Sequence, residues 1–221
     1  MTGPGRRVVD LAHTITEGLV TYPGIPVPTL GSHLSFDGSV GVYAEGTEFS
    51  MGTITMAANT GTYLDTPAHR YRHGQDLADF PLERMVDLEG VVLATTERSI
   101  GAAALAHLDV RGKAVLVATG HDRHFGAEAY AVDHPHLTAD AAGWLVERGA
   151  ALVGIDSINI DGTHTGERPV HTALLAAGIP VVEHLTGLDQ LPPTGFRFTA
   201  APPKVAGLGT FTVRAFALVP T

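Results

Sequence analysis

The stretch "LTADAAGWLVERGAALVGIDSINID", residues 137–161, predicts a helix followed directly by a strand. Thr138 is a suitable N-cap, and Gly149 ends the helical pattern. Between them Ala141, Trp144 and Leu145 give the helix one apolar side. The remaining "ALVGIDSINID" predicts a strand that begins directly after the helix.

The same alternation of strands and helices continues on both sides of this stretch. Short apolar runs, rich in β-branched residues, predict strands that are buried on both faces of a sheet. The run "RPVHTALLAAG" predicts a helix with Pro169 in its first turn and Gly178 at its end. Further strands are predicted at 90–95, 113–120, 179–185 and 209–219, and further helices at 98–110 and 168–178. This order favours an α/β fold with a mixed or parallel sheet and helices packed against it.

The N-terminal half reads mainly as strands and loops. Residues 6–15 predict a first strand, residues 20–29 form a Pro/Gly-rich loop, and residues 46–61 predict one or two strands that end at Gly61. No linker, low-complexity run or convincing repeat interrupts the chain, so we expect a single domain over residues 1–221.

Composition excludes several classes of protein. The net charge of −9 and the lack of a Lys/Arg run argue against nucleic-acid binding, because phosphate contacts need clustered positive charge. The absence of cysteine excludes disulfides, thiolate metal ligands and a cysteine nucleophile. No secretory signal and no stretch of membrane-spanning length is present, so we expect a cytoplasmic protein without membrane contact. A charged fraction of only 17% suits a compact oligomer.

The stretch "NTGTYLDTPAHRY", residues 59–71, is the first candidate for a functional site. Gly61 permits a left-handed backbone, and Pro67 biases Thr66 toward an extended conformation. A stiff loop that carries Asp65 and His69 four residues apart is suited to hold a ligand or a metal ion. The same pattern also fits a solvated turn with a capping Asp and a surface His, and the sequence leaves both interpretations open.

Two further regions place polar residues where sites are often found. His171 falls in the first turns of a predicted helix, facing the strand layer, and is otherwise a core or surface histidine. Glu183 lies near the carboxyl end of a predicted buried strand, where a bare carboxylate is costly. It either takes part in a site, pairs with Arg168 or is hydrated. The segment 119–126, which follows another buried strand, either lines a pocket or forms an exposed loop.

The chain resembles the cyclase family, which includes bacterial kynurenine formamidase and isatin hydrolase. The family pattern is His-x-Gly-Thr-His-x-Asp-x-Pro-x-His, and residues 59–69 fill the same frame as "NTGTYLDTPAH". The resemblance continues through "DLAHTITEGLVTYPG", "PLERM", "VLVATGHDRH", "PVHTALLAAGIPVVEHLTGL" and "FTVRAFAL", in order, over nearly the whole chain.

This resemblance implies a swivelling β/β/α domain with a mixed sheet and flanking helices, assembled as a homo-oligomer (a dimer or tetramer). It implies metal-assisted hydrolysis of a small amide, lactam or lactone-type substrate. By position, four of the family's metal-binding residues are present, namely Asp65, His69, His171 and Glu183. The two leading histidines of the motif are replaced by Asn59 and Tyr63.

The two replacements change the expected chemistry. An Asn amide is a weak zinc ligand, and a Tyr must lose a proton with a pKa of about 10 before it binds a metal. The remaining residues suffice for one divalent ion, zinc or manganese. A metal-free site is equally compatible, with His69 as general acid or base, Asp65 orienting it and Glu183 as a second carboxylate. Tyr63 would then donate a hydrogen bond to an oxyanion, and Asn59 is a second group capable of hydrogen bonding.

Several functional alternatives therefore stay open. The main expectation is a hydrolase of C–N bonds, with a metal-independent lyase or cyclase in the same pocket as an alternative. A non-catalytic small-molecule-binding member of the family is the third possibility. Because two expected ligands are absent, a dedicated kynurenine formamidase is less expected than the family name suggests. Tyr22 and Phe125 are candidates to enclose an apolar substrate ring, or are plain packing residues.

Overall fold

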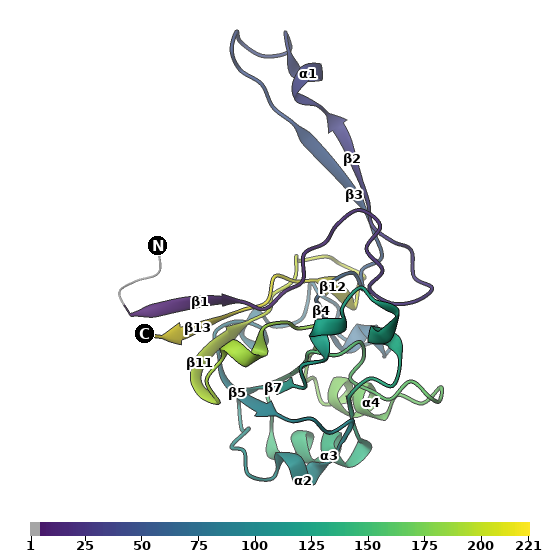
Figure 1. Cartoon of the computed structure of the whole chain (residues 1–221), viewed down its shortest axis with the longest axis vertical. Coiled ribbons are helices and arrows are strands. Elements are labelled where there is room, and N and C mark those ends of the chain that lie inside the picture. Colours follow the sequence, from purple (N-terminus) through teal and green to yellow (C-terminus); the bar gives the residue numbers. More distant parts are fainter. Residues whose placement is uncertain (1–4) are drawn as a thin grey trace.

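The computed structural model describes residues 5–221, and a nine-stranded mixed sheet forms its centre (Figure 1). The strands follow the spatial order β1 (Arg6–Asp10), β13 (Phe216–Pro220), β11 (Thr194–Thr199), β5 (Leu88–Ala94), β7 (Ala114–Ala118), β9 (Leu152–Ile155), β10 (Val181–Glu183), β4 (Tyr63–Asp65) and β12 (Thr210–Thr212). Strands β5, β7, β9 and β10 are parallel, and the other pairings are antiparallel. The predicted α/β fold with a mixed sheet is confirmed.

Helices cover one face of the parallel strands, as Figure 1 shows below β5 and β7. They are α2 (Ala102–Leu105), α3 (Ala139–Arg148) and α4 (Pro169–Ala176). The short strands β6 (Ser99–Ile100), before α2, and β8 (His136–Leu137), before α3, pair with each other in a separate two-stranded sheet. Single-turn 3₁₀ segments complete the structure: η1 (Pro67–His69), η2 (Leu82–Arg84), η3 (His121–His124), η4 (Glu128–Ala131) and η5 (Leu188–Gln190).

Two apolar cores lie on opposite faces of the sheet. Alternate strand residues such as Val117 and Val153 pack with the helices, whereas their neighbours Leu116 and Leu152 join the core inside the curl of the sheet. This is why the parallel strands are apolar on both faces. The sequence patterns at 90–95 and 113–120 predicted this double burial correctly.

Helix α3 follows the sequence prediction, with one difference at its start. Thr138 occupies the N-cap position and Gly149 adopts the left-handed conformation that ends the helix. The Thr138 hydroxyl lies 2.5 Å from the carboxylate of Asp140 and 3.2 Å from the carbonyl of Ile100, with one hydrogen to donate, and caps no helical N–H. It therefore fastens the helix start to the neighbouring β6 segment.

Several predicted elements are shorter or divided. The helix predicted at 98–110 is only the single turn α2, preceded by β6. The strand predicted at 209–219 is split into β12 and β13, which pair with different neighbours at opposite ends of the sheet order. The first strand ends at Asp10, and the strand predicted to reach Gly61 ends at Thr55. Residues 63–65, within the motif, form the short strand β4 instead.

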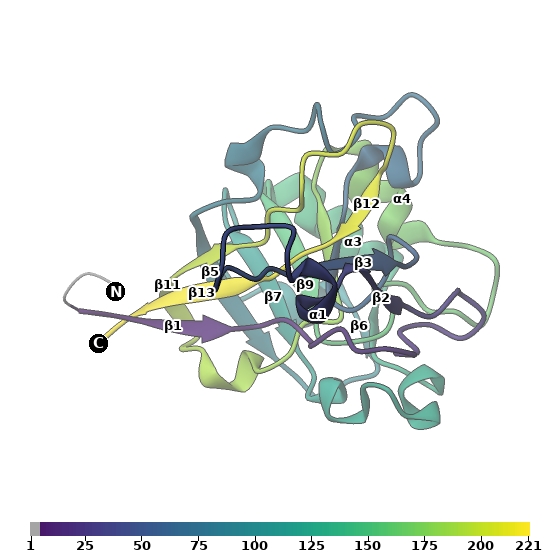
Figure 2. The same ribbon diagram turned by 90° about the horizontal axis from the view of Figure 1, so that it is seen from above.

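A hairpin, which we call the arm, projects from the body of the molecule in Figure 1 and lies in front of the sheet in the view from above in Figure 2. It consists of β2 (Thr29–Leu34), the single turn α1 (Phe36–Ser39) and β3 (Met51–Thr55). Within residues 5–221 the strands β2 and β3 pair only with each other.

No described helix of residues 5–221 has the length and apolar character that crossing a bilayer requires.

Candidate metal centre

Strands β4 and β10 carry the polar residues of the site on their helix-facing side. Leu64 and Val182 point into the core inside the curl, so by alternation Tyr63, Asp65 and Glu183 point the other way. In the antiparallel register Glu183 is opposite Tyr63. Thr66 is extended, as predicted, and Pro67 begins the 3₁₀ turn that ends with His69. The motif thus presents Asp65 and His69 together.

Asp65, His69 and His171 form the group that is best placed to hold a metal ion. Each offers one ligand atom, and these atoms lie within 4.8 Å of one another. Asp65 and His171 are buried, while the side chain of His69 is 35% exposed. The site is therefore open to solvent on the His69 side.

Two buried polar atoms at this point have no hydrogen-bond partner. They are Asp65 Oδ2 and His171 Nε2, which lie 3.5 Å apart. Unpaired buried polar atoms are rare because each one costs free energy. A carboxylate oxygen and an imidazole nitrogen that face each other in this way fit ligands of a divalent cation. With His69 they supply the three protein ligands that are typical of a catalytic zinc site.

Helix α4 brings His171 to the strands, and Asp161 fixes where this helix begins. The Asp161 carboxylate accepts the backbone N–H groups of Val170 (2.7 Å) and His171 (3.0 Å). It also lies 2.6 Å from Nδ1 of the His171 ring. The backbone and ring hydrogen bonds lower the pKa of Asp161, although burial acts in the opposite direction and is the largest single influence.

Glu183 is held by two short hydrogen bonds. The Tyr63 hydroxyl donates to Oε2 at 2.5 Å, and the backbone N–H of Ile160 donates to Oε1 at 2.6 Å. Oε1 is also 3.5 Å from His171 Nε2. The alternative in which Glu183 pairs with Arg168 is not observed, since the Arg168 guanidinium donates to the backbone carbonyls of Thr165 and Glu167.

Tyr63 and Asn59, the two replaced motif positions, lie together beside Glu183. Burial, followed by the charges of Glu183 and Asp65, raises the pKa of Tyr63 well above its ordinary value, whereas a hydrogen bond from Asn59 acts in the opposite direction. Tyr63 therefore remains a neutral phenol whose proton is engaged by Glu183. In this arrangement its hydroxyl is not free to donate to an oxyanion, which was one of the roles considered for it.

The charges in the site depend on one another. Burial opposes protonation of His171, but Glu183, Asp161 and Asp65 together raise its pKa to about 10. Burial raises the pKa of Glu183 to about 7, assisted by Asp65 and opposed by His171. Without a bound cation, a positively charged His171 is what neutralises the surrounding carboxylates.

Strand β12, which pairs with β4 on the side opposite β10, contacts two of the candidate ligands, Asp65 and His69. The Thr210 hydroxyl donates to Asp65 Oδ1 and lies 2.6 Å from His69 Nδ1. Gly209 allows this approach, because a Cβ at position 209 would stand only 2.1 Å from the backbone nitrogen of His69. Asp65 Oδ1 and His69 Nδ1 are thus occupied, which leaves the other polar atom of each side chain for a ligand.

Asp161 and Thr210 were not identified from the sequence. Asp161 stands at the end of the stretch 137–161 and Thr210 at the start of a predicted strand. The capping rule gives no signal for Asp161, because Arg168 occupies the N-cap position of the helix that begins at Pro169. No sequence signal places Thr210 beside Asp65.

The predicted substrate-binding residues lie elsewhere in the structure. Phe125 stacks on His13, with ring centroids 3.6 Å apart, and belongs to an aromatic group with Tyr130 and His184. Tyr22 is half-buried in the loop that leads to the arm. Within residues 5–221 no hydrogen bond or ring contact joins either side chain to the three candidate ligands, so their substrate-binding role stays a prediction.

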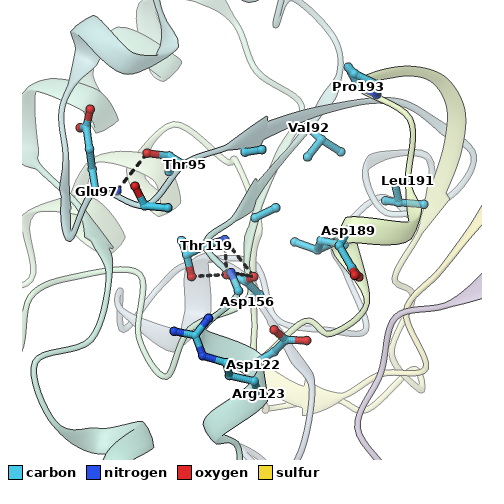
Figure 3. A pocket seen from close by; sticks show the side chains of 15 residues that line it. Val92, Thr95, Glu97, Thr119, Asp122, Arg123, Asp156, Asp189, Leu191 and Pro193 are labelled. Carbon is cyan, nitrogen blue, oxygen red and sulfur yellow. Dashed lines mark hydrogen bonds between the residues drawn. The ribbon is translucent and has the colours of Figure 1, made fainter.

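A cavity of about 930 Å³ opens near the carboxyl ends of β5, β7 and β9 (Figure 3). Thr119, Gly120, Asp122 and Arg123 line it, as the pocket interpretation of residues 119–126 predicted. Buried Asp156 accepts hydrogen bonds from the Thr119 and Gly120 backbones at its floor. Asp65, His69 and His171 do not line this cavity, so its shape does not describe the candidate metal centre.

Comparison with known proteins agrees with the observed fold. Kynurenine formamidase from Bacillus cereus is 26% identical over 209 residues, which cover 94% of this chain and 95% of the relative. Kynurenine formamidase from Geobacillus thermodenitrificans is 28% identical over 208 residues, with the same coverage of 94% and 95%.

Solved structures with the same fold include a potential metal-dependent hydrolase with cyclase activity, at a TM-score of 0.80 and 25% identity, covering 98% of this chain and 99% of that one. Isatin hydrolase A from Ralstonia solanacearum superimposes with a TM-score of 0.82 and 25% identity, covering 97% and 92% of the two chains. The family model described as putative cyclase matches residues 9–162, more than half of the sequence. The chain is a member of the cyclase family.

Proposed function

We propose that the protein is an enzyme that hydrolyses the C–N bond of a small amide or lactam, or a related lactone, with the help of one divalent ion. The contact between Asp65 Oδ2 and His171 Nε2, two buried atoms without a hydrogen-bond partner, carries this proposal, because a divalent ion bound by both would satisfy both. The relatives named kynurenine formamidase and isatin hydrolase support an amide-type substrate.

Asp65, His69 and His171 would hold the ion, with zinc or manganese as the ions that suit two imidazoles and one carboxylate. Such an ion polarises a carbonyl group and lowers the pKa of water, which are the two requirements of amide hydrolysis at neutral pH. The exposed side of His69 is where a substrate would approach.

The remaining residues have supporting tasks in this proposal. Glu183 sits 3.5 Å from His171 Nε2 and keeps negative charge next to the ligands. Tyr63 and Ile160 hold the Glu183 carboxylate in place. Tyr63, engaged by Glu183, and Asn59 stand in place of the family's two leading histidines, which favours one ion over two.

Metal analysis of protein purified without chelator, followed by activity assays, tests the proposal. We expect one zinc or manganese ion per chain, loss of amide or lactone hydrolysis after chelation, and recovery when the ion is added back. N-formylkynurenine belongs in the substrate panel as the compound that the relatives' name indicates. The result that would overturn the proposal is turnover of a panel member that is unaffected both by metal removal and by His69→Ala.

We further propose that the protein works as a homo-oligomer formed through the arm. Isolated two-stranded hairpins are at best marginally stable in water, and the arm pairs with no other strand. Leu30 pairs with Ile54 and Leu34 with Met51, which places large apolar side chains along the hairpin. Leu30 and Ile54 are 48% and 51% exposed. A second copy of the chain is the partner that would cover this surface.

A further inference from the structure

The Asp161 carboxylate makes three hydrogen bonds, and only one of them concerns the chemistry of the site. Two come from the backbone N–H groups of Val170 and His171 and belong to the start of α4. The third joins its Oδ2 to Nδ1 of the His171 ring at 2.6 Å. Asp161 is fully buried, so water does not compete with its carboxylate for Nδ1 of the His171 ring.

The third contact determines the tautomer of His171. An ionised carboxylate can only accept hydrogen bonds, so Nδ1 must carry a hydrogen atom. In the neutral ring Nε2 then has the free lone pair, and Nε2 is the atom that lies unpaired 3.5 Å from Asp65 Oδ2. The same carboxylate also fixes the ring plane, because it holds the backbone and the side chain of His171 at once.

We propose that Asp161 is a positioning residue that sets the metal affinity of the site by presenting the Nε2 lone pair of His171 to the ion. The inference rests on the metal-dependent function proposed above. A carboxylate behind a metal-binding histidine orients the ring and strengthens it as a ligand, and its loss lowers metal affinity by about 10- to 100-fold.

Asp161→Asn tests the proposal. The Asn oxygen still accepts a backbone N–H of α4, but its NH₂ group next to Nδ1 favours the opposite tautomer, with hydrogen on Nε2. We expect the zinc and manganese affinities of the full chain, measured by chelator competition, to fall by about 10- to 100-fold. An affinity within about twofold of the wild type would overturn the proposal.

Asp156→Asn is the matched control. Asp156 is also a buried carboxylate that accepts backbone N–H groups, here from Thr119 and Gly120, but it contacts no imidazole. If Asp161 only stabilised the fold, both variants would lower the melting temperature and neither would change metal affinity. If Asp161→Asn does not fold, Asp161→Glu is the substitute: its longer side chain displaces the carboxylate from His171 Nδ1, so metal affinity should fall, and an unchanged affinity in that folded variant would count against the proposal.

A metal-independent readout separates this inference from the proposed function. In ¹⁵N-edited NMR spectra of the metal-free wild type, the hydrogen on His171 Nδ1 should exchange slowly and resonate downfield, because the Asp161 carboxylate accepts it. In Asp161→Asn no carboxylate accepts this hydrogen, so the downfield shift and the slow exchange should both be lost. Failure of the wild type to bind zinc or manganese would refute the metal-dependent function but leave this result meaningful. An unchanged shift and exchange rate in Asp161→Asn would refute the positioning role of Asp161 whatever the metal result.

Discussion

His171 Nε2 and Asp65 Oδ2 face each other across 3.5 Å, and neither atom has a hydrogen-bond partner within the described structure. One comes from the first turn of α4 and the other from the end of β4. Their other polar atoms are engaged, by Asp161 and Thr210 respectively. The hydrogen bonds therefore orient both side chains so that Asp65 Oδ2 and His171 Nε2 could bind the same metal ion.

Replacement of Asp65 by Asn should abolish tight metal binding. The amide is nearly isosteric and still accepts the Thr210 hydroxyl, but it removes the negative charge that the ion requires. Loss of a residue that binds the ion directly should lower metal affinity more than loss of a residue that only hydrogen-bonds to a ligand. We therefore expect zinc affinity to decrease by at least about 100-fold. Asp10→Asn is a control, since Asp10 pairs with exposed Arg214 away from the site. Equal metal affinities of the two variants would contradict Asp65 as a ligand.

Thr210→Val should weaken metal binding without removing a ligand. Valine keeps the shape of threonine but cannot donate to Asp65 Oδ1 or contact His69 Nδ1. Both ligands then lose a partner that orients them, and we expect a drop in zinc affinity of about 10-fold. Thr212→Val is the matched control, because the Thr212 hydroxyl donates to the Thr62 backbone carbonyl on the same strand pair. Chelator competition compares the two variants, and an effect of Thr212→Val as large as that of Thr210→Val would argue against orientation by Thr210.

Tyr63→Phe should destabilise the fold more than Tyr130→Phe does. Both hydroxyls are buried, but Tyr63 donates to the carboxylate of Glu183, whereas Tyr130 is 3.0 Å from the imidazole of His184. A buried carboxylate that loses a donor costs about 1–3 kcal/mol, and an ordinary hydrogen bond contributes about 0.5–1.5 kcal/mol. Urea unfolding of the metal-free variants measures the difference in the free energy of unfolding. A larger loss for Tyr130→Phe would show that the Tyr63–Glu183 contact is not a strong one.

Three features of the candidate site could be predicted from the sequence because neighbouring residues determine them. Gly61 permits a left-handed backbone and Pro67 restricts the conformation of Thr66, so the extended Thr66 and the turn that carries His69 follow from nearby residues. The first turn of α4 and the buried position of Glu183 were likewise set by local patterns, namely Pro169 and the apolar run before Glu183.

The features that were missed depend on contacts between distant segments. Thr210 reaches Asp65 only because β12 pairs with β4, although the 209–219 stretch reads as one continuous strand. The arm was also missed as a projecting element, because its strands alternate no differently from strands of a sheet. Local patterns identify ligand-bearing segments, whereas the strand order that joins them is a property of the whole chain.

Acid should destabilise the protein through buried His134. Burial, the largest influence, lowers the pKa of His134 to about 4, although a hydrogen bond to the Pro135 carbonyl acts in the opposite direction. The unfolded chain binds a proton near the ordinary value of about 6.5. The folded state does not bind it until about pH 4. The free energy of unfolding therefore decreases as the pH falls through this window and is unaffected by His134 above it.

His134→Gln isolates this effect. Between about pH 7.5 and about pH 5 the wild type should lose about 1–2 kcal/mol more of its unfolding free energy than the variant. Exposed His107→Gln should behave like the wild type. Urea unfolding at both pH values gives the comparison, and equal pH dependence of wild type and His134→Gln would mean that folding does not lower the pKa of His134.

Ile54→Asp should convert the proposed oligomer to monomers. Ile54 is paired with Leu30 on the arm, and both are about half exposed in the isolated chain, so a charge here costs little in the monomer. In an interface between copies the same carboxylate would be desolvated without a partner, which is strongly unfavourable. Light scattering coupled to size exclusion should therefore show a larger species for the wild type and a single chain for the variant. Val132→Asp, at another exposed apolar residue outside the arm, should leave the assembly unchanged. A monomeric wild type, or an Ile54→Asp variant that stays assembled, would show that the arm is covered in some other way.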